Sequence, residues 1–351
     1  MKYRIIFFAY LIIYITGVKA QTLQQLTIVG DSCMKAYDYH NAIGYYEKAS
    51  ALNASYKLRM KLAECYYQRT NYRKSNEILE AIPQDSLTHD ALRMFYYGAG
   101  AVKDIKKQLF LGDLIAIRYP MDSKILADVM RLYTSDAVDK PIFALKRGQL
   151  YVDRDSTNNE VNRALGEAYF MTGFYEKCIQ TYARVHQQGD TTYNSLYYTG
   201  GAFEYLNHND SAAVYFSKAI AREPKLAVGF YRLGMVENKL GEYDKAVEHL
   251  KTATKLYEPN KTIMFVIYRA MGDAKQSVND LRLATLYWSY ALAYQEDKEL
   301  QTKVGRTSLT SPTSPTSPTG LLHLNTCKTN YFAFPIFKTH NYILLLTMFN
   351  L

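Results

Sequence analysis

Acidic residues are missing from both ends of the chain, although the middle contains many of them. The first 20 residues carry Lys2, Arg4 and Lys19 without an acid, and no Asp or Glu follows Glu299. The formal net charge of +9 therefore comes mainly from the two ends, and the body between them is nearly neutral. Because a nucleic-acid interface needs a clustered basic face, this distribution argues against a nucleic-acid partner.

Cysteine is scarce, with four residues in a chain of 351. Cys33, Cys65, Cys178 and Cys327 form no CxxC pair and have no zinc-like spacing to a histidine, so the sequence is neither a disulfide scaffold nor a zinc module. Cys33 and Cys65 fall near equivalent places of adjacent helical segments. Two interpretations stay open for them: a disulfide formed in an oxidising compartment, or two small buried thiols.

Catalytic and nucleotide-binding signatures are absent from the sequence. It contains no HExxH or GxSxG motif, no phosphate-binding glycine loop and no paired-glycine dinucleotide motif. The seven histidines are scattered, and the glycine pair Gly98 and Gly100 lies inside a helical stripe, where close packing explains it. We therefore expect no catalytic residue, no metal ligand and no cofactor, and we predict that the protein is not an enzyme.

The first residues have the features of a signal peptide. Lys2 and Arg4 precede an apolar run over residues 5–15, and small residues at Val18 and Ala20 precede a cleavage position before Gln21. The run is shorter than the roughly 20 residues that span a bilayer, so an uncleaved anchor is the less favoured alternative. The pattern predicts export across the inner membrane to the periplasm or cell envelope, with no membrane span after cleavage.

Two apolar stripes at helical spacing recur along the chain with a constant period. Residues 226–259 contain two such stripes, separated by Gly241 and closed by Pro259. Small residues such as Gly234 and Ala246 occupy the positions where two helices of a hairpin approach closely, and large residues such as Phe216 and Phe230 fill the space around them. Matching units precede this one in unbroken register, so the sequence is an array of helical hairpins. A sixth unit, which starts near Phe265, begins about four residues late, and this predicts a longer loop around Glu258–Thr262 or a longer preceding helix.

This spacing resembles the tetratricopeptide repeat, and the segment Gly241–Ala246, GEYDKA, resembles that family's turn between helices. The resemblance covers Leu23 to about Lys298. It implies an all-α fold, an α-α superhelix or solenoid of helix hairpins. The stretch 85–158 keeps helical periodicity but departs from the repeat, so it is interpreted as two degenerate hairpins, with an interdomain break as the alternative.

The sequence therefore divides into five segments. They are a signal peptide (1–20), N-terminal repeats (21–84), the degenerate hairpins (85–158), C-terminal repeats (159–302) and a low-complexity tail (303–351). The tail contains SPTSPTSPTG and no acidic residue. Its composition suggests a disordered or non-native segment, such as read-through in the wrong frame.

The family resemblance also implies a binding surface. In proteins of this kind the first helix of each hairpin lines a concave groove that holds a peptide or a helix. The chaperone-binding members hold a terminal carboxylate with lysine and asparagine, but Glu167 and Gly201 stand where asparagine is needed, so an acidic chaperone tail is not expected. The groove candidates are Arg163, Glu167, Phe170, Asn194, Tyr197, Tyr198, Tyr205, Tyr231, Met235, Asn238, Arg269 and Asp273.

The favoured function is a cell-envelope scaffold or adaptor that binds a segment of another protein in this groove. One alternative is the sensor half of a signalling protein whose output domain lies beyond the tail. Another is a glycan-capture accessory protein, because the chain has 33 tyrosines and such side chains are common at binding surfaces. The sequence does not identify the partner or the oligomeric state.

Overall fold

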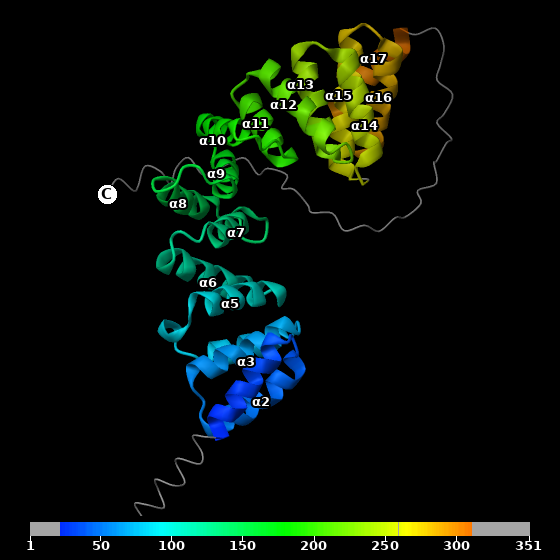
Figure 1. Cartoon of the computed structure of the whole chain (residues 1–351). Helices are drawn as coiled ribbons and strands as arrows, with labels where there is room; N and C mark the ends of the chain where they lie inside the picture. Colours follow the sequence, from blue (N-terminus) through cyan, green and yellow to red (C-terminus); the bar gives the residue numbers. More distant parts are fainter. Residues whose placement is uncertain (1–21, 259, 311–351) are drawn as a thin grey trace, which may run out of the picture. The chain divides into compact units, whose positions relative to one another are not determined.

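The computed structural model describes residues 22–258 and 260–310, and in these residues the chain is entirely helical apart from turns and loops (Figure 1). No β-strand occurs in the described ranges, so the all-α prediction is confirmed. The predicted signal peptide and all of the tail after residue 310 lie outside the described residues. The chain divides into two compact units, Met1–Leu132 and Tyr133–Leu351, with the boundary inside the stretch predicted as degenerate hairpins.

The first unit begins with a helix over residues 22–35 and continues as helical hairpins. Its core brings Tyr46 and Ala49 of the second helix against Leu58, Leu62 and Cys65 of the third. The further elements are α2 (Tyr39–Leu52), α3 (Tyr56–Gln68), α4 (Tyr72–Glu80), the 3-10 helix η1 (Gln84–Ser86), α5 (His89–Ala101), α6 (Ile105–Arg118) and α7 (Ser123–Thr134), whose end crosses the boundary.

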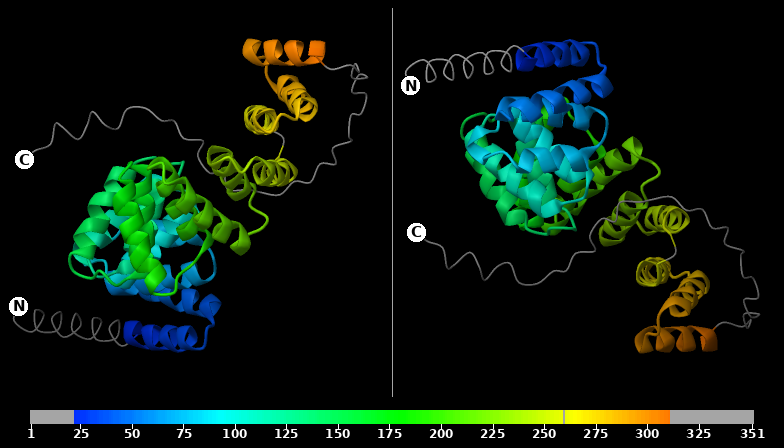
Figure 2. Two further views of the ribbon diagram at one scale, coloured as in Figure 1. Left: turned by 90° about the horizontal axis from the view of Figure 1, so that it is seen from above. Right: turned by 90° about the horizontal axis from the view of Figure 1, so that it is seen from below.

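The second unit continues the hairpins in regular order, and its last three helices lie side by side in the two views of Figure 2. Its helices are α8 (Pro141–Val152), α9 (Asn159–Met171), α10 (Tyr175–Gln187), α11 (Tyr193–Tyr205), α12 (Asn209–Arg222), α13 (Ala227–Leu240), α14 (Tyr243–Leu256), α15 (Lys261–Ser277), α16 (Leu281–Tyr294) and α17 (Lys298–Thr310). Helix α17 thus extends past residue 302, where the sequence placed the end of the repeats.

Short polar side chains begin many of these helices. Ser55, Thr88 and Asn158 each accept a hydrogen bond from the backbone N–H three residues later, which satisfies one of the unpaired donors of the first turn. At the other end of α13, Gly241 adopts a left-handed conformation with φ of 78°, which glycine adopts without steric cost. The turn predicted from GEYDKA is therefore set by local residue chemistry.

The close helix approach predicted within the hairpins is present. A methyl group placed on Gly234 of α13 would lie 3.0 Å from the carbonyl oxygen of Ala246 on α14, so only a hydrogen fits there. Phe216 is fully buried, as predicted for a side chain that fills the space between helices. Phe230, in contrast, is only partly buried and packs at the edge of the core around Leu250.

The sixth predicted repeat begins late in the sequence pattern, and the structure shows where the extra residues lie. We expected a longer loop around Glu258–Thr262 or a longer preceding helix. Instead α14 has 14 residues, like α12, and α15 itself has 17 residues. The extra turn is inside α15 because an added helical turn keeps its backbone hydrogen-bonded, whereas the same residues in a loop would need other partners.

Candidate binding surface

Successive odd-numbered helices of the second unit contact one another, in addition to the helix that each pairs with in its own hairpin. Contacts join α9 to α11, α11 to α13, and α13 to α15. We call the surface formed by these four helices the odd-helix face. Every predicted groove residue belongs to one of the four helices. The repeat register therefore places all of them on successive odd-numbered helices.

Three of the predicted groove residues have buried side chains. Phe170 is 2% exposed, Tyr197 8% and Tyr198 7%. The ring of Phe170 on α9 lies 5.1 Å from that of Tyr198 on α11, and a methyl group on Gly201 would come within 2.8 Å of the Phe170 ring. These aromatic side chains therefore pack neighbouring repeats together, and Gly201 provides the space for them.

Other predicted residues remain accessible on the same face. Asn194 at the start of α11 is exposed, while Tyr205, Tyr231, Met235 and Asn238 are half-buried. The Asn238 amide donates a hydrogen bond to the carbonyl oxygen of Ala270 on α15, at 3.3 Å. The uncharged groove candidates that remain accessible are thus tyrosine, methionine and asparagine side chains.

The four charged residues among the predictions all have partners within the chain. Arg163 forms an ion pair with Asp190 at 3.0 Å, and Glu167 accepts a hydrogen bond from the hydroxyl of Thr134 at 3.1 Å. Arg269 and Asp273 of α15 belong to a network with α17. The charged side chains that were predicted to contact a ligand are therefore already paired with groups of the same chain.

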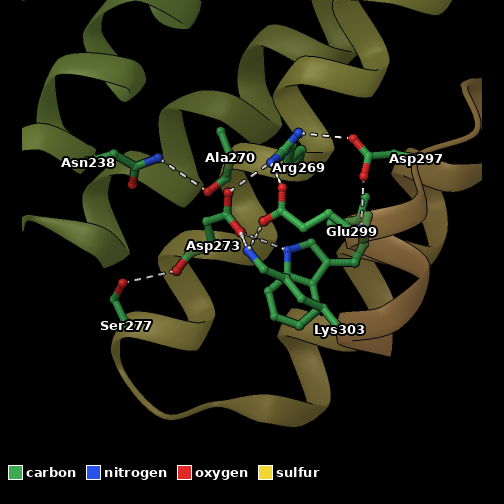
Figure 3. Close-up of polar contacts among 10 residues, drawn as sticks. Asn238, Arg269, Ala270, Asp273, Ser277, Asp297, Glu299 and Lys303 are labelled. Carbon is green, nitrogen blue, oxygen red and sulfur yellow. Dashed lines mark hydrogen bonds and ion pairs between the residues drawn. The ribbon is translucent and has the colours of Figure 1, made fainter. Parts of the chain in front are cut away.

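That network closes the odd-helix face at its C-terminal end (Figure 3). Arg269 bonds to Asp297 and Glu299, both at 3.1 Å. Asp273 accepts hydrogen bonds from the indole of Trp288 at 3.1 Å and from the Lys303 ammonium at 3.3 Å. Because these contacts join α15, α16 and α17, they fix the last hairpin to the helix that follows it.

An ion-paired group that the sequence reasoning missed lies between α11 and α13. The carboxylate of Glu204 is 2.9 Å from the guanidinium of Arg232 and 2.8 Å from the ammonium of Lys239. The side chains of Glu204 and Arg232 are 9% and 18% exposed. The repeat register could have pointed to the two cations. Arg232 and Lys239 lie one repeat period after the groove candidates Tyr198 and Tyr205, so they occupy the equivalent positions of the next repeat.

Four partly exposed tyrosines surround this ion pair. The rings of Tyr175 and Tyr205 stack in parallel with centroids 4.6 Å apart, and Tyr231 meets Tyr257 edge to face at 6.5 Å. The Arg232 guanidinium lies 5.6 Å from the Tyr205 ring centroid, within range of a cation–π interaction. We call Tyr175, Tyr205, Tyr231 and Tyr257 the tyrosine cluster.

Burial moves the ionisation of the tyrosine hydroxyl groups here to higher pH. It raises the pKa of Tyr175 to about 12, and the neighbouring Tyr205 adds to the effect while Arg232 opposes it. Burial likewise raises the pKa of Tyr197 to about 12, and it raises the pKa of Tyr257 above the usual range of tyrosine. The hydroxyl groups of these tyrosines are therefore neutral hydrogen-bonding groups well above physiological pH.

A separate pocket of about 630 Å³ lies in the first unit, at the junction of α5, α6 and α7. Its buried carboxylate, Asp122, accepts hydrogen bonds from His89 at 2.8 Å and from Arg93 at 2.8 and 2.7 Å. Asp122 also accepts from the backbone N–H of Ile125. Asp122 caps α7, and its carboxylate is hydrogen-bonded to His89 and Arg93 of α5. This group therefore holds the two helices together.

The remaining chemistry of the described residues is sparse. Within residues 22–258 and 260–310, His, Cys, Asp and Glu form no group that could hold a metal ion. No helix in the same ranges is long and apolar enough to cross a membrane. Cys33 and Cys65 are free thiols in the structure, and burial raises the pKa of Cys65 to about 12, which makes its thiol unreactive at neutral pH.

Two family models match parts of the chain. The tetratricopeptide repeat model matches residues 227–260, the unit with the clearest sequence pattern. The model for the fourth ARM domain of tetratricopeptide repeat protein 21 matches residues 27–99. A search among curated proteins gave no match.

Several solved structures resemble the chain. The TPR protein YrrB is 15% identical, with 56% of this chain and 97% of that chain covered and a TM-score of 0.48. MamA is 24% identical, with 46% of this chain and 92% of that chain covered and a TM-score of 0.41. The C-terminal part of a TPR repeat-containing protein from Cytophaga hutchinsonii is 16% identical, with 79% of this chain and 99% of that chain covered and a TM-score of 0.43. At these values none of the three bears on function. Residues 227–260 therefore match a tetratricopeptide repeat, and the other helical hairpins are similar to it in their sequence pattern.

Proposed function

We propose that the chain is a non-catalytic scaffold that binds a segment of another protein, a peptide or a helix, on the odd-helix face. The observation that supports this most is the tyrosine cluster with Met235 beside it on α13. Tyrosine and arginine are enriched among the residues that contribute most to protein interfaces. Tyrosine also offers a large apolar ring and a polar hydroxyl while losing little conformational entropy.

The arrangement of the helices supports the same proposal. Contacts between successive odd helices make a surface that continues across repeats, and repeat proteins use such extended surfaces for binding. The residues beneath the surface are fixed, because Phe170, Tyr198 and the Glu204–Arg232 ion pair link neighbouring hairpins. A fixed surface loses less entropy on binding than a mobile one.

Affinity purification from the native host's envelope fraction tests this proposal. The bait is compared with Met235→Glu, which places a carboxylate on the odd-helix face, and with Val214→Glu on α12. Val214 is 51% exposed and lies outside the odd-helix face, so its variant is a matched control for added charge. We expect a partner that Met235→Glu loses at least tenfold, or about 1.4 kcal/mol, and that Val214→Glu retains. The proposal fails if both variants retain it.

We also propose that the protein is exported and acts in the periplasm or cell envelope. This rests on the basic start, the apolar run over residues 5–15 and the small residues before Gln21. Mass spectrometry of the protein isolated from its host checks it. We expect an N-terminal peptide that starts at Gln21, whereas recovery of peptides from the first 20 residues would contradict cleavage.

A further inference from the structure

The pocket at the junction of α5, α6 and α7 has the size of a small-ligand site. Its volume of about 630 Å³ falls within the range of roughly 300–1,000 Å³ that is common for small-molecule pockets. Its lining residues lie between positions 89 and 124 and therefore belong to the first unit. The odd-helix face belongs to the second unit, so a ligand of this pocket is a separate question from the proposed function.

Positive charge predominates among the side chains that line the pocket. Arg93 of α5, Arg118 of α6 and Lys124 of α7 are permanent cations, and Asp122 is the one carboxylate among the lining residues. Asp122 is 2% exposed and is paired with His89 and Arg93, so its charge is compensated below the surface. The lining thus carries an excess of two positive charges without any contribution from His89.

Arg93 keeps hydrogen-bond donors that the protein does not use. Its Nη1 atom alone donates to both carboxylate oxygens of Asp122, at 2.8 and 2.7 Å. Its Nε and Nη2 atoms form no hydrogen bond within the described residues, and the side chain is 33% exposed. The contact with Asp122 fixes the guanidinium, so these two nitrogens are a prepared pair of donors for a planar or tetrahedral oxyanion.

The other two cations have partners outside the pocket lining. Arg118 pairs with Asp85, whose side chain is 93% exposed, and Lys124 lies 3.3 Å from Asp128 and is 50% exposed. Asp128 also pairs with Arg131 at 3.1 Å, so it would keep a cation if Lys124 turned away. Exposed ion pairs contribute little free energy, and both cations can therefore turn toward a ligand at small cost.

An apolar wall lies beside the cations. The rings of His89 and Tyr119 stack with centroids 4.0 Å apart and planes inclined by 19°. Pro120 and Met121 line the same pocket, and Met121 is 58% exposed. Methionine and aromatic rings offer polarisable contact area, which suits the organic part of a ligand whose anionic group meets the cations.

We infer that this pocket binds a phosphate monoester. The phosphate accepts hydrogen bonds from Nε and Nη2 of Arg93 and pairs with Arg118 and Lys124, while the organic part of the ester lies against Tyr119 and Met121. A phosphate monoester carries a charge of about −1.5 to −2 near neutral pH, which matches the excess of two positive charges better than a single carboxylate does. Arginine is well suited to phosphate because its planar fork donates two parallel hydrogen bonds.

Isothermal titration calorimetry of the full chain with phenyl phosphate tests the inference. We expect the dissociation constant to rise about tenfold in Arg93→Lys, which keeps a cation beside Asp122 but lacks the two free nitrogens. Lys124→Gln should raise it about threefold. Arg73→Gln on α4 is the matched control, because Arg73 is exposed and does not line the pocket. Its dissociation constant should stay within about twofold of that of the unchanged chain.

Three results would overturn the inference. They are undetectable binding at about 10 mM phenyl phosphate, equal affinity of Arg93→Lys and the unchanged chain, and benzoate bound as tightly as phenyl phosphate. Thermal unfolding of each variant shows whether it is folded, and Lys124→Gln leaves the contacts of Asp122 in place if Arg93→Lys is not. None of these results bears on the proposed function, which concerns the odd-helix face.

A second titration distinguishes the two sources of a phosphate monoester. A short, otherwise uncharged peptide with one phosphoserine is compared with phenyl phosphate. Tighter binding of the peptide indicates a phosphorylated protein segment as the ligand, and tighter binding of phenyl phosphate indicates a free organic phosphate. Either order supports the inference, provided that Arg93→Lys weakens both ligands, and added salt should weaken both because the contact is ionic.

Discussion

The indole of Trp288 lies directly over Gly272. A methyl group on the Gly272 α-carbon would come within 2.3 Å of Cδ1 and 2.4 Å of Nε1 of the ring. The ring cannot move aside easily, because Trp288 is fully buried and its Nε1–H donates to Asp273 at 3.1 Å. A glycine on the first helix and a large side chain on the second therefore define how close this hairpin packs.

Replacing that glycine should destabilise the protein. We expect Gly272→Ala to lower the free energy of unfolding by about 1–3 kcal/mol through overpacking. Gly305→Ala on α17 is the matched control, since an added methyl group there meets nothing within 4 Å, and it should raise stability by roughly 0.5–1 kcal/mol because alanine favours the helix. Urea unfolding followed by circular dichroism measures both. A Gly272→Ala protein as stable as the unchanged protein would contradict the close contact between Gly272 and the Trp288 indole.

Thr70 carries backbone strain in the turn between α3 and α4. Its φ of 59° lies in the left-handed region, which costs a residue with a β-carbon about 1–2 kcal/mol and is uncommon for a β-branched residue. We expect Thr70→Gly to raise the free energy of unfolding by about 1 kcal/mol. The reciprocal change Gly241→Ala, at a turn with φ of 78°, should lower it by a similar amount, and thermal unfolding of the two variants should shift in opposite directions.

Removing one partner of the Glu204–Arg232 pair should cost more than removing both. Glu204→Ala leaves the Arg232 guanidinium largely buried without its closest carboxylate, and we expect a loss of about 3 kcal/mol. Replacing both residues by methionine removes both charges together, so the double variant should recover most of that loss. If the double variant is as unstable as Glu204→Ala, the ion pair is not the source of the effect.

Stability should fall in alkaline solution. Burial raises the pKa of Tyr175 and of Tyr197 from 10.0 to about 12, so the native state keeps protons that the unfolded state releases. The contribution is fully present below about pH 10, declines as the pH rises, and is lost by about pH 12. Tyrosinate absorbance and helical circular dichroism, recorded together during a base titration, should therefore change together, and ionisation of these tyrosines well before unfolding would contradict their burial.

Much of the fold could be predicted from the sequence, because it depends on local rules. The repeat register paired Gly234 with Ala246, and this contact is present in the structure. The same register assigned every groove candidate to an odd helix. It misplaced the extra residues near α15, since a period counts residues without showing whether they extend a helix or a loop.

The division of the candidate site into buried and accessible side chains could not be predicted in the same way. Tyr197 and Tyr231 are equivalent in sequence, yet Tyr197 is buried and Tyr231 is half-buried, because the burial of each depends on the neighbouring repeat. The closest ion-pair partners of Arg163, Arg269 and Asp273 come from loops and helices outside their own helix.

The sequence alone determined the helical hairpins, their period and the close glycine contacts, because helical spacing, turn residues and small side chains act within one repeat. Tertiary structure decided which tyrosines face solvent and that the single carboxylate of Glu204 pairs with both Arg232 and Lys239. These properties arise from side chains of different repeats that meet only after the hairpins stack. Burial and ion pairing at such contacts depend on distances that no single repeat contains.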